Sequence, residues 1–241
     1  MIKGLFRISS TSGKTLLWLL LKKDLANVKG ELGVDLAGGN MLNKSFFKTK
    51  RYVSVDINQI KLSEGLETYP DATAVHDTVQ NYLSRTVEKP DLLVCVQTFG
   101  TNMFFEHQET IKVIKNMSKT LRVGGSMAFN VGIIEGDFDL EELKSYLSPF
   151  LKARFQNVNF RFYGAMHDRV KLEVRLKFTE NGMKRTSNNT LYKVGVLKKS
   201  INLVKSISML SLAYIMYLLP PLRTSFGKKK KFLYCFCSNK L

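Results

Sequence analysis

The sequence predicts an α/β fold with a mostly parallel seven-stranded sheet, helices on both of its faces, and an insertion before the last strand. Strand-like apolar segments alternate with helix-like segments through the first two thirds of the chain. A glycine turn, Gly38-Gly39, follows the first of these strands. The segment 92–96 is an almost continuous apolar run, which is typical of a strand covered on both faces. Such alternation implies parallel strands joined by right-handed crossovers.

The elements follow from these patterns in chain order. An amphipathic helix is expected near 13–28 and a long helix near 105–121. A further helix is expected over 138–150, with Asp137 or Asp139 as its N-cap. We expect strands near 32–36, 51–56, 72–76, 91–97, 126–131, 157–163 and 231–237. This organisation divides the chain into an N-terminal helical segment (1–30), a core (31–163), an insertion (164–230) and the last strand of the core (231–241).

The first strand and its glycine turn indicate a nucleotide-type pocket. The run Val34-Asp35-Leu36-Ala37-Gly38-Gly39-Asn40 places glycines where the backbone must turn sharply and approach a ligand. Asp56 ends the second strand, and a carboxylate about 20 residues beyond such a turn can accept hydrogen bonds from the hydroxyls of an adenosine ribose. A dinucleotide pyrophosphate would need G-x-G-x-x-G, which is missing here. The pocket therefore favours S-adenosylmethionine over NAD.

Ala37 is the unusual residue of this turn. Alanine tolerates the turn at modest cost if its φ is negative, whereas a positive φ would strain the backbone.

The order of these motifs resembles the class I, Rossmann-like S-adenosylmethionine-dependent methyltransferases. The resemblance covers roughly residues 30–132 and rests on Asp35 with Gly38-Gly39, then Asp56, Asp77, Asp91 and the run Leu121-Arg122-Val123-Gly124-Gly125. Ala37 and Met41 stand where the family usually has glycine, and Val123 stands where it usually has proline. The family fold implies that the last strand inserts antiparallel beside the sixth.

The same resemblance implies roles for individual residues. Asp35 would fix the turn and face the amino acid end of S-adenosylmethionine, Gly38 and Gly39 would admit the cofactor, and Asp56 would hold its ribose. Asp77 and Thr78 would frame the adenine; a solvated loop is the alternative for them. Ala37, Ile57 and Gln97 complete the implied cofactor pocket. His107 matches a histidine often found at this place in the resembling group, and the near-neutral pKa usual for histidine would suit a general base; a histidine that packs locally at a helix start is the alternative.

Cysteine and histidine usage favours a cytoplasmic protein without a metal. Cys95, Cys235 and Cys237 are an odd number with no disulfide or zinc spacing. His76, His107 and His167 are scattered along the chain, so core packing of the cysteines is expected and no metal site is. We recognise no signal peptide, because the apolar run 16–21 is short and lysines bound it.

The insertion is strongly basic and contains an apolar helix. After Glu180 the chain has 12 Lys and Arg and no acidic residue, out of a net charge of +17 for the whole protein. The apolar segment 201–222 is flanked by lysines, and its uncharged part is too short to cross a bilayer comfortably. A helix lying in the interface of an anionic membrane, with 198–231 as the contact region, explains this pattern. A core helix and a nucleic-acid surface are the alternatives.

Together these features predict a methyltransferase that works at a membrane surface. The sequence-based hypothesis is a cytoplasmic enzyme, peripherally attached to the inner face of the membrane, that O-methylates a lipid-linked or amphipathic acceptor such as a glycolipid, a glycan intermediate or an isoprenoid. An RNA methyltransferase with a basic RNA-binding tail is one alternative. A non-catalytic, methyltransferase-like membrane adaptor is the other.

Overall fold

The computed structural model describes residues 12–100, 107–132, 139–164, 208, 211–212, 214–219 and 231–241. The sheet belongs to one compact unit, Leu20–Tyr163 with Lys229–Leu241; the other unit is Met1–Leu19 with Gly164–Lys228. In chain order the elements are α1 (Ser12–Leu25), β1 (Lys29–Leu36), η1 (Lys44–Phe46), β2 (Lys48–Asp56), α2 (Gln59–Thr68), β3 (Thr73–His76), α3 (Val79–Arg85), β4 (Leu92–Gly100), α4 (His107–Thr120), β5 (Ser126–Gly132), α5 (Leu140–Lys152), β6 (Phe155–Gly164) and β7 (Lys231–Lys240).

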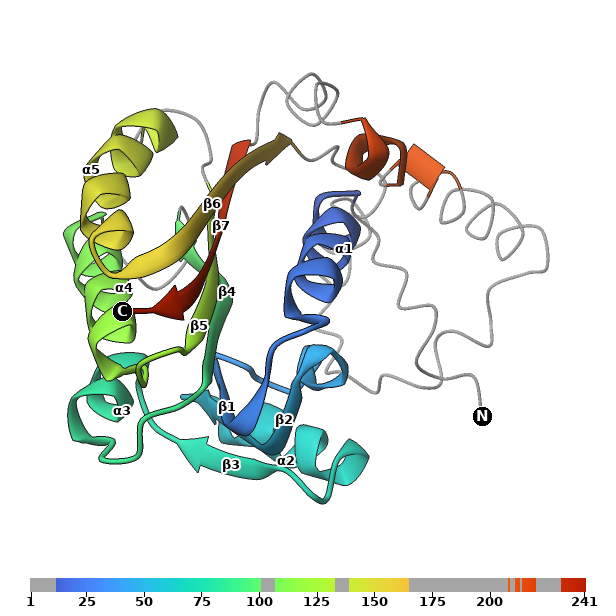
Figure 1. Cartoon of the computed structure of the whole chain (residues 1–241). Coiled ribbons are helices and arrows are strands. Elements are labelled where there is room, and N and C mark those ends of the chain that lie inside the picture. Colours follow the sequence, from blue (N-terminus) through green and yellow to red (C-terminus); the bar gives the residue numbers. More distant parts are fainter. Residues whose placement is uncertain are drawn as a thin grey trace. The chain divides into compact units, whose positions relative to one another are not determined.

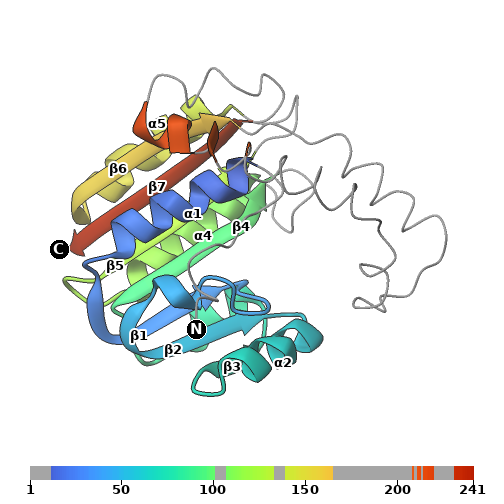
Figure 2. The same ribbon diagram turned by 90° about the vertical axis from the view of Figure 1, so that its right-hand side faces the viewer.

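Seven strands form a sheet in the order β3-β2-β1-β4-β5-β7-β6 (Figure 2). β1 pairs in parallel with β2 and β4, β2 pairs in parallel with β3, and β4 with β5. β7 runs antiparallel to β5 and lies between β5 and β6. Helices α3, α4 and α5 lie on one face of the sheet and α2 lies on the other (Figure 1). The mostly parallel seven-stranded sheet predicted from the sequence is confirmed.

Apolar side chains with strand or helix spacing build the core. The run Leu92–Val96 of β4 is buried along its whole length, as its unbroken apolar character predicts. α5 buries Leu140, Leu143, Leu147 and Leu151, which share one face of the helix. Burying each such leucine stabilises the fold by roughly 1.5–3 kcal/mol. Cys235 and Cys237 are buried as free thiols, which agrees with the expected core packing.

Element boundaries differ from the sequence expectation at several places. The helix expected over 13–28 ends at Leu25, because Lys29 and Gly30 already pair with β2. The helix expected over 138–150 runs from Leu140 to Lys152, and Asp139 is its N-cap, accepting a hydrogen bond from the Glu141 N–H at 2.8 Å. Asp137 lies outside the described residues, as does the beginning of the helix expected from residue 105.

Two helices were not foreseen. α2 and α3 are short, and each begins at a side-chain cap: Asn58 accepts from the Lys61 N–H, and Thr78 accepts from the Asn81 N–H. The link from β1 to β2, in contrast, contains only the three-residue helix η1. Parallel strands are usually joined by a longer, helical crossover. The first crossover of this sheet is therefore abbreviated.

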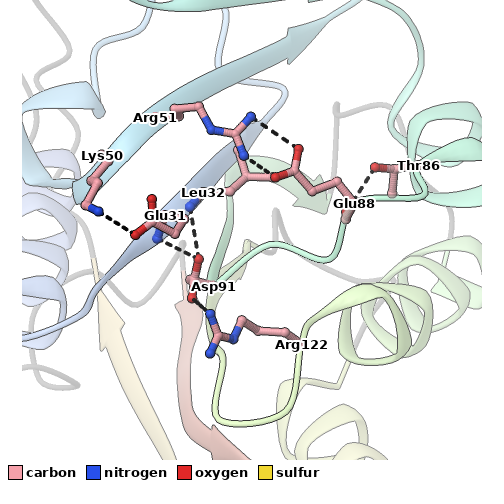
Figure 3. Close-up of polar contacts among 8 residues, drawn as sticks. All are labelled: Glu31, Leu32, Lys50, Arg51, Thr86, Glu88, Asp91 and Arg122. Carbon is pink, nitrogen blue, oxygen red and sulfur yellow. Dashed lines mark hydrogen bonds and ion pairs between the residues drawn. The ribbon is translucent and has the colours of Figure 1, made fainter.

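Asp91 joins three elements at the amino end of β4 (Figure 3). One carboxylate oxygen accepts the Glu31 and Leu32 N–H groups of β1 at 2.8 and 2.9 Å, and the other accepts from Arg122 at 2.7 Å. The lack of a side chain at Gly30 leaves room for it, since a Cβ there would lie 2.3 Å from the Asp91 Cγ. This carboxylate fixes the edge of the sheet opposite to the glycine turn.

Exposed ion pairs surround that anchor. Lys50 pairs with Glu31, and Arg51 pairs with Glu88 (Figure 3). All four side chains are more than half exposed, so water screens both pairs and they add little to stability. These pairs lie on the surface of this edge, whereas the hydrogen bonds of Asp91 fix its backbone.

The end of α1 is fastened to β6 by a bidentate ion pair. Arg161 donates to both carboxylate oxygens of Asp24, at 2.5 and 3.1 Å. The Asp24 side chain is almost completely buried, so removing its partner would leave a buried charge without compensation. This contact helps to hold the helix that leads into β1.

Candidate functional site

The carboxyl ends of β1, β2, β3 and β4 bring the predicted pocket residues to one edge of the sheet. Leu36 of β1 is level with Val55 of β2 and Cys95 of β4, and Asp56 is level with His76 of β3. The residues that come next in each chain segment therefore share this edge. From β1 the chain continues to β2 and β3 on one side, and then returns to β4 on the other side of β1. In open α/β sheets, ligands bind outside the carboxyl ends of the strands at the point where the strand order reverses in this way.

The glycine turn has an alternating left-handed backbone. Ala37, Gly39 and Met41 have φ values of 55°, 50° and 60°. The Gly38 N–H donates to the Val55 carbonyl at 3.1 Å, and the Met41 N–H donates to the Gly38 carbonyl at 2.9 Å. These bonds close a tight turn between β1 and η1.

Gly38 is required by space, not by φ. A Cβ at this position would lie 2.4 Å from the Ser54 Oγ and 2.9 Å from a carboxylate oxygen of Asp35. The bare backbone therefore passes directly over the ends of β1 and β2, where a ligand can approach it.

Ala37 and Met41 carry the strain that the two family glycines would avoid. A left-handed conformation costs an L-residue roughly 1–2 kcal/mol relative to glycine. Met41 is held by packing, because its buried side chain occupies the space above Gly65 of α2, where a Cβ would lie 2.7 Å from the Met41 Cγ. The conformation of Ala37 is thus the strained alternative that the sequence left open.

Asp56 is fixed beside the turn by two backbone donors. The Gly39 N–H donates to one carboxylate oxygen at 2.9 Å, and the Asn58 N–H donates to the other at 2.8 Å. Each oxygen keeps a second lone pair. Ile57, the next residue, is 53% exposed although it is apolar. The structure therefore sets an anchored carboxylate and an apolar surface side by side.

Asp35 lies beneath the turn and is completely buried. The Tyr52 hydroxyl donates to its carboxylate at 2.8 Å, and the Asn43 side-chain amide donates at 3.2 and 3.3 Å. Burial raises the pKa of Asp35 to about 7, although both hydrogen bonds oppose the shift. Its carboxyl group therefore supports the turn from inside the protein.

Asp77 and Thr78 follow β3, and their side chains are engaged locally. Asp77 accepts the Thr78 N–H at 2.8 Å and pairs with Arg85 of α3. Desolvation acts to raise the pKa of Asp77, but these hydrogen bonds outweigh it and lower the pKa. The Thr78 hydroxyl caps α3 by accepting the Asn81 N–H.

Gln97 interrupts the regular pairing at the end of β4. It is exposed and has a φ of 61°, and its N–H donates to the Asn130 side-chain oxygen at 2.6 Å. His107 begins α4, but its side chain lies outside the described part of the protein. No cluster of His, Cys, Asp and Glu that could hold a metal occurs in the described ranges.

Asn43, Tyr52 and Asn130 are the partners that sequence reasoning missed. Tyr52 and Asn130 contact site residues 17 and 33 positions away in the chain, and Asn43 contacts Asp35 across the glycine turn. No local sequence pattern marks these contacts. Asn58 did carry a signal, because an asparagine just before a helical segment is a preferred N-cap.

Comparisons with known proteins agree with this geometry at the level of the fold. No family model and no curated protein matches the sequence. An S-adenosylmethionine-dependent methyltransferase from Thiobacillus denitrificans, solved with S-adenosyl-L-homocysteine, is 12% identical over 98% of this chain and 96% of its own, with a TM-score of 0.50.

Two further solved structures have lower TM-scores. An rRNA methylase from Streptococcus thermophilus is 18% identical over 62% of this chain and 88% of its own, with a TM-score of 0.47. Phosphoethanolamine N-methyltransferase 2 from Haemonchus contortus, in complex with S-adenosyl-L-methionine, is 15% identical over 95% of this chain and 53% of its own, with a TM-score of 0.48. The chain has the fold of the class I, Rossmann-like methyltransferases.

We predict that Ala37→Gly stabilises the protein by about 0.5–1 kcal/mol, because glycine adopts the left-handed conformation without a Cβ clash. The measurement is chemical denaturation in the absence of ligand. Gly39→Ala is the reciprocal control: a Cβ there has ordinary space, 3.4 Å from its nearest neighbour, so its φ alone should destabilise the protein by roughly 1–2 kcal/mol. A loss of stability in Ala37→Gly would contradict the left-handed turn.

We also predict that Asp35 makes stability depend on pH. The folded protein keeps the Asp35 proton to about pH 7, whereas the unfolded chain releases it near the usual value of 3.8. This contribution is fully present below pH 3.8 and is lost as the pH rises to 7, by an amount on the order of 4 kcal/mol. Asp35→Asn should therefore gain stability relative to the parent protein across this interval.

The measurement for Asp35 is the difference in unfolding free energy between parent and variant from pH 4 to 8. Asp71→Asn is the control, because Asp71 is exposed and its pKa is lowered by the hydrogen bond from Lys44. Its difference from the parent should stay flat above pH 5. An equally flat curve for Asp35→Asn would show that Asp35 is already charged in the folded protein.

Proposed function

We propose that the protein is an S-adenosylmethionine-dependent methyltransferase. The observation that carries this proposal is the Asp56 carboxylate, which two backbone N–H groups hold beside the glycine turn. Its free lone pairs suit the two adjacent hydroxyls of an adenosine ribose. The exposed face of Ile57 gives the adenine an apolar surface to lie on.

The turn favours this cofactor over a dinucleotide. A pyrophosphate binds best at the N-terminus of a helix, but here the turn leads into the three-residue helix η1. Gly38 has no room for a side chain, because a Cβ there would clash with Asp35 and Ser54, so the turn lies close against the ends of β1 and β2. The fit is therefore to a nucleoside whose link to its second group carries no phosphate, as in S-adenosylmethionine.

The chemistry required of the protein is mainly positioning. When bound, S-adenosylmethionine would supply an activated methyl group, because its sulfonium releases a neutral thioether when the methyl group is transferred. The chain's own residues have to align the acceptor with that methyl group and exclude water, which together can contribute up to ~7–11 kcal/mol. A hydroxyl acceptor also needs to lose its proton, and we propose His107, at the start of α4, as the base.

We expect Asp56→Ala to weaken S-adenosylmethionine binding by roughly 10- to 100-fold. A hydrogen bond to a charged group contributes about 1.5–3 kcal/mol, and tenfold in affinity corresponds to about 1.4 kcal/mol. Isothermal titration calorimetry measures the effect. The affinity of Asp56→Asn for S-adenosylmethionine should lie between those of the parent protein and Asp56→Ala, since asparagine keeps one acceptor oxygen.

Glu88→Gln is the matched control for Asp56. Glu88 is an exposed carboxylate that pairs with Arg51 and lies at the opposite edge of the sheet, so its loss should leave the affinity unchanged. If the parent protein does not bind S-adenosylmethionine, the methyltransferase proposal is wrong.

For the acceptor we propose a lipid-linked or amphipathic hydroxyl compound at the inner face of a membrane. Tyr214, Ile215, Leu218 and Leu219 are 46%, 45%, 69% and 51% exposed. Their spacing puts them on adjoining rows of one helical surface. Exposed apolar groups gathered in this way mark an interaction surface, and the neighbouring sequence supplies Lys228 to Lys231 for anionic headgroups. None of the described helices has the length and apolar character needed to span a bilayer.

We expect the double variant Leu218→Ser/Leu219→Ser to lose at least about 10-fold in partitioning to vesicles that mix phosphatidylcholine with phosphatidylserine. Each leucine inserted contributes roughly 1.5–3 kcal/mol. Vesicle co-sedimentation measures it. Val87→Ser is the control, because Val87 is 93% exposed but lies in the sheet unit. Equal sedimentation of the double variant and the parent would refute membrane docking by this helix.

Two rival functions give different results in the same experiments. An RNA methyltransferase would bind RNA with a steep salt dependence and transfer labelled methyl groups to it. A membrane adaptor would bind vesicles without forming S-adenosylhomocysteine. Transfer of labelled methyl groups into a lipid extract supports the acceptor proposed here, and mass spectrometry of that extract identifies it.

A further inference from the structure

The end of β4 contains a bulge that is closed by one buried side chain. β4 pairs regularly with β5 up to Cys95, opposite Phe129, and pairing resumes at Phe99, opposite Val131. Three residues, 96 to 98, therefore face the single residue Asn130. In such a bulge the extra residues leave the regular ladder and the strand bends.

Asn130 satisfies the backbone group that this bulge leaves unpaired. Its side-chain oxygen accepts the Gln97 N–H at 2.6 Å, and its amide nitrogen donates to the Tyr163 hydroxyl at 3.3 Å. Asn130 is 2% exposed, and Tyr163 is itself held by stacking on Phe232, with ring centroids 5.0 Å apart. The acceptor oxygen is thus fixed from β6 and β7.

Gln97 has an unusual backbone conformation as a result. Its φ of 61° is left-handed, which is costly for a residue with a side chain and persists only where the surroundings impose it. Between Leu92 and Phe99 all residues except Gln97 are buried, and Gln97 is exposed. The bulge therefore turns one polar side chain out of the core.

The position of Gln97 gives this exposure a function. Cys95 is level with Leu36, so Gln97 emerges from the strand next to the glycine turn, at the edge where Asp56 is anchored. Its carboxamide can accept a hydrogen bond from a hydroxyl or amine and can also donate one.

We propose that Asn130 is a positioning residue, which holds the left-handed bulge at Gln97 so that the Gln97 carboxamide can orient the O–H or N–H group of the methyl acceptor. This inference rests on the proposed methyltransferase function. Nothing in the sequence marks Asn130, because its role depends on the register of β5 against β4.

The first test is structural and needs neither cofactor nor acceptor. In a crystal structure of Asn130→Ala, the φ of Gln97 should leave the left-handed region. In Tyr163→Phe it should stay there, because that variant loses only the bond from the Asn130 amide and keeps the acceptor oxygen. A left-handed Gln97 that persists in Asn130→Ala would overturn the positioning role.

The second test is a double-mutant cycle on turnover, measured as transfer of labelled methyl groups from S-adenosylmethionine to a membrane lipid extract. Asn130→Ala and Gln97→Gly should each lower kcat about 10-fold or more, and the loss in kcat should exceed any loss in affinity for S-adenosylmethionine. In the Gln97→Gly background, Asn130→Ala should have no further effect on kcat, because glycine needs no support in the bulge.

The outcomes separate this inference from the proposed function. Effects of the two substitutions that multiply would show that Asn130 supports the fold generally and does not act through Gln97. If the parent protein neither binds S-adenosylmethionine nor transfers methyl groups, the proposed function is wrong and so is the acceptor role of Gln97, whereas the crystal structures still decide whether Asn130 sets the bulge. If Asn130→Ala does not fold by itself, the comparison is made between Gln97→Gly and the double variant Asn130→Ala/Gln97→Gly, because glycine at position 97 removes the backbone strain. Equal kcat values for these two proteins support the inference, and a lower kcat in the double variant contradicts it.

Discussion

The abbreviated link between β1 and β2 is the constraint on which the candidate site depends. Without a long crossover helix, the chain must reverse within a few residues of Leu36, and three left-handed residues achieve this. The turn so formed is compact enough for the Gly39 N–H to reach Asp56 on the neighbouring strand. Its compactness also explains why Gly38 has no room for a side chain. The short connection therefore explains both the backbone strain at Ala37 and Met41 and the position of the glycine turn beside Asp56.

Buried polar groups support the edge of the sheet from below. Asp35 with Tyr52 and Asn43 lies under the glycine turn, and Asn130 lies beside the β4 bulge. Each satisfies its hydrogen bonds within the protein, which a buried polar group requires if it is not to destabilise the fold. The side chains left for a ligand are consequently few, and Ile57 and Gln97 are exposed among them. The opposite edge is fixed separately, by Asp91.

The positions of the seven strands along the chain, and of the helices α1, α4 and α5, could be predicted, because period, apolar runs and turn residues act locally. The apolar run 92–96 identified the central strand, and the glycines after Leu121 identified the turn before β5. The boundaries of α1 and α5 were less certain, since strand pairing at Lys29 and capping by Asp139 decided them. α2 and α3 escaped prediction because both are short and depend on their caps and on packing against the sheet.

By itself the sequence determined the cofactor class to be considered: the spacing of Gly38-Gly39 and Asp56 follows from strand length, and strand length is a local property. Only the tertiary structure decided how that pocket is built. The positive φ of Ala37 results from the short crossover, and the high pKa of Asp35 results from burial that neighbouring strands impose. The partnership of Asn130 with Gln97 likewise arises from the register of two strands. Contacts between residues far apart in the chain have no local pattern, and for that reason the fold alone reveals them.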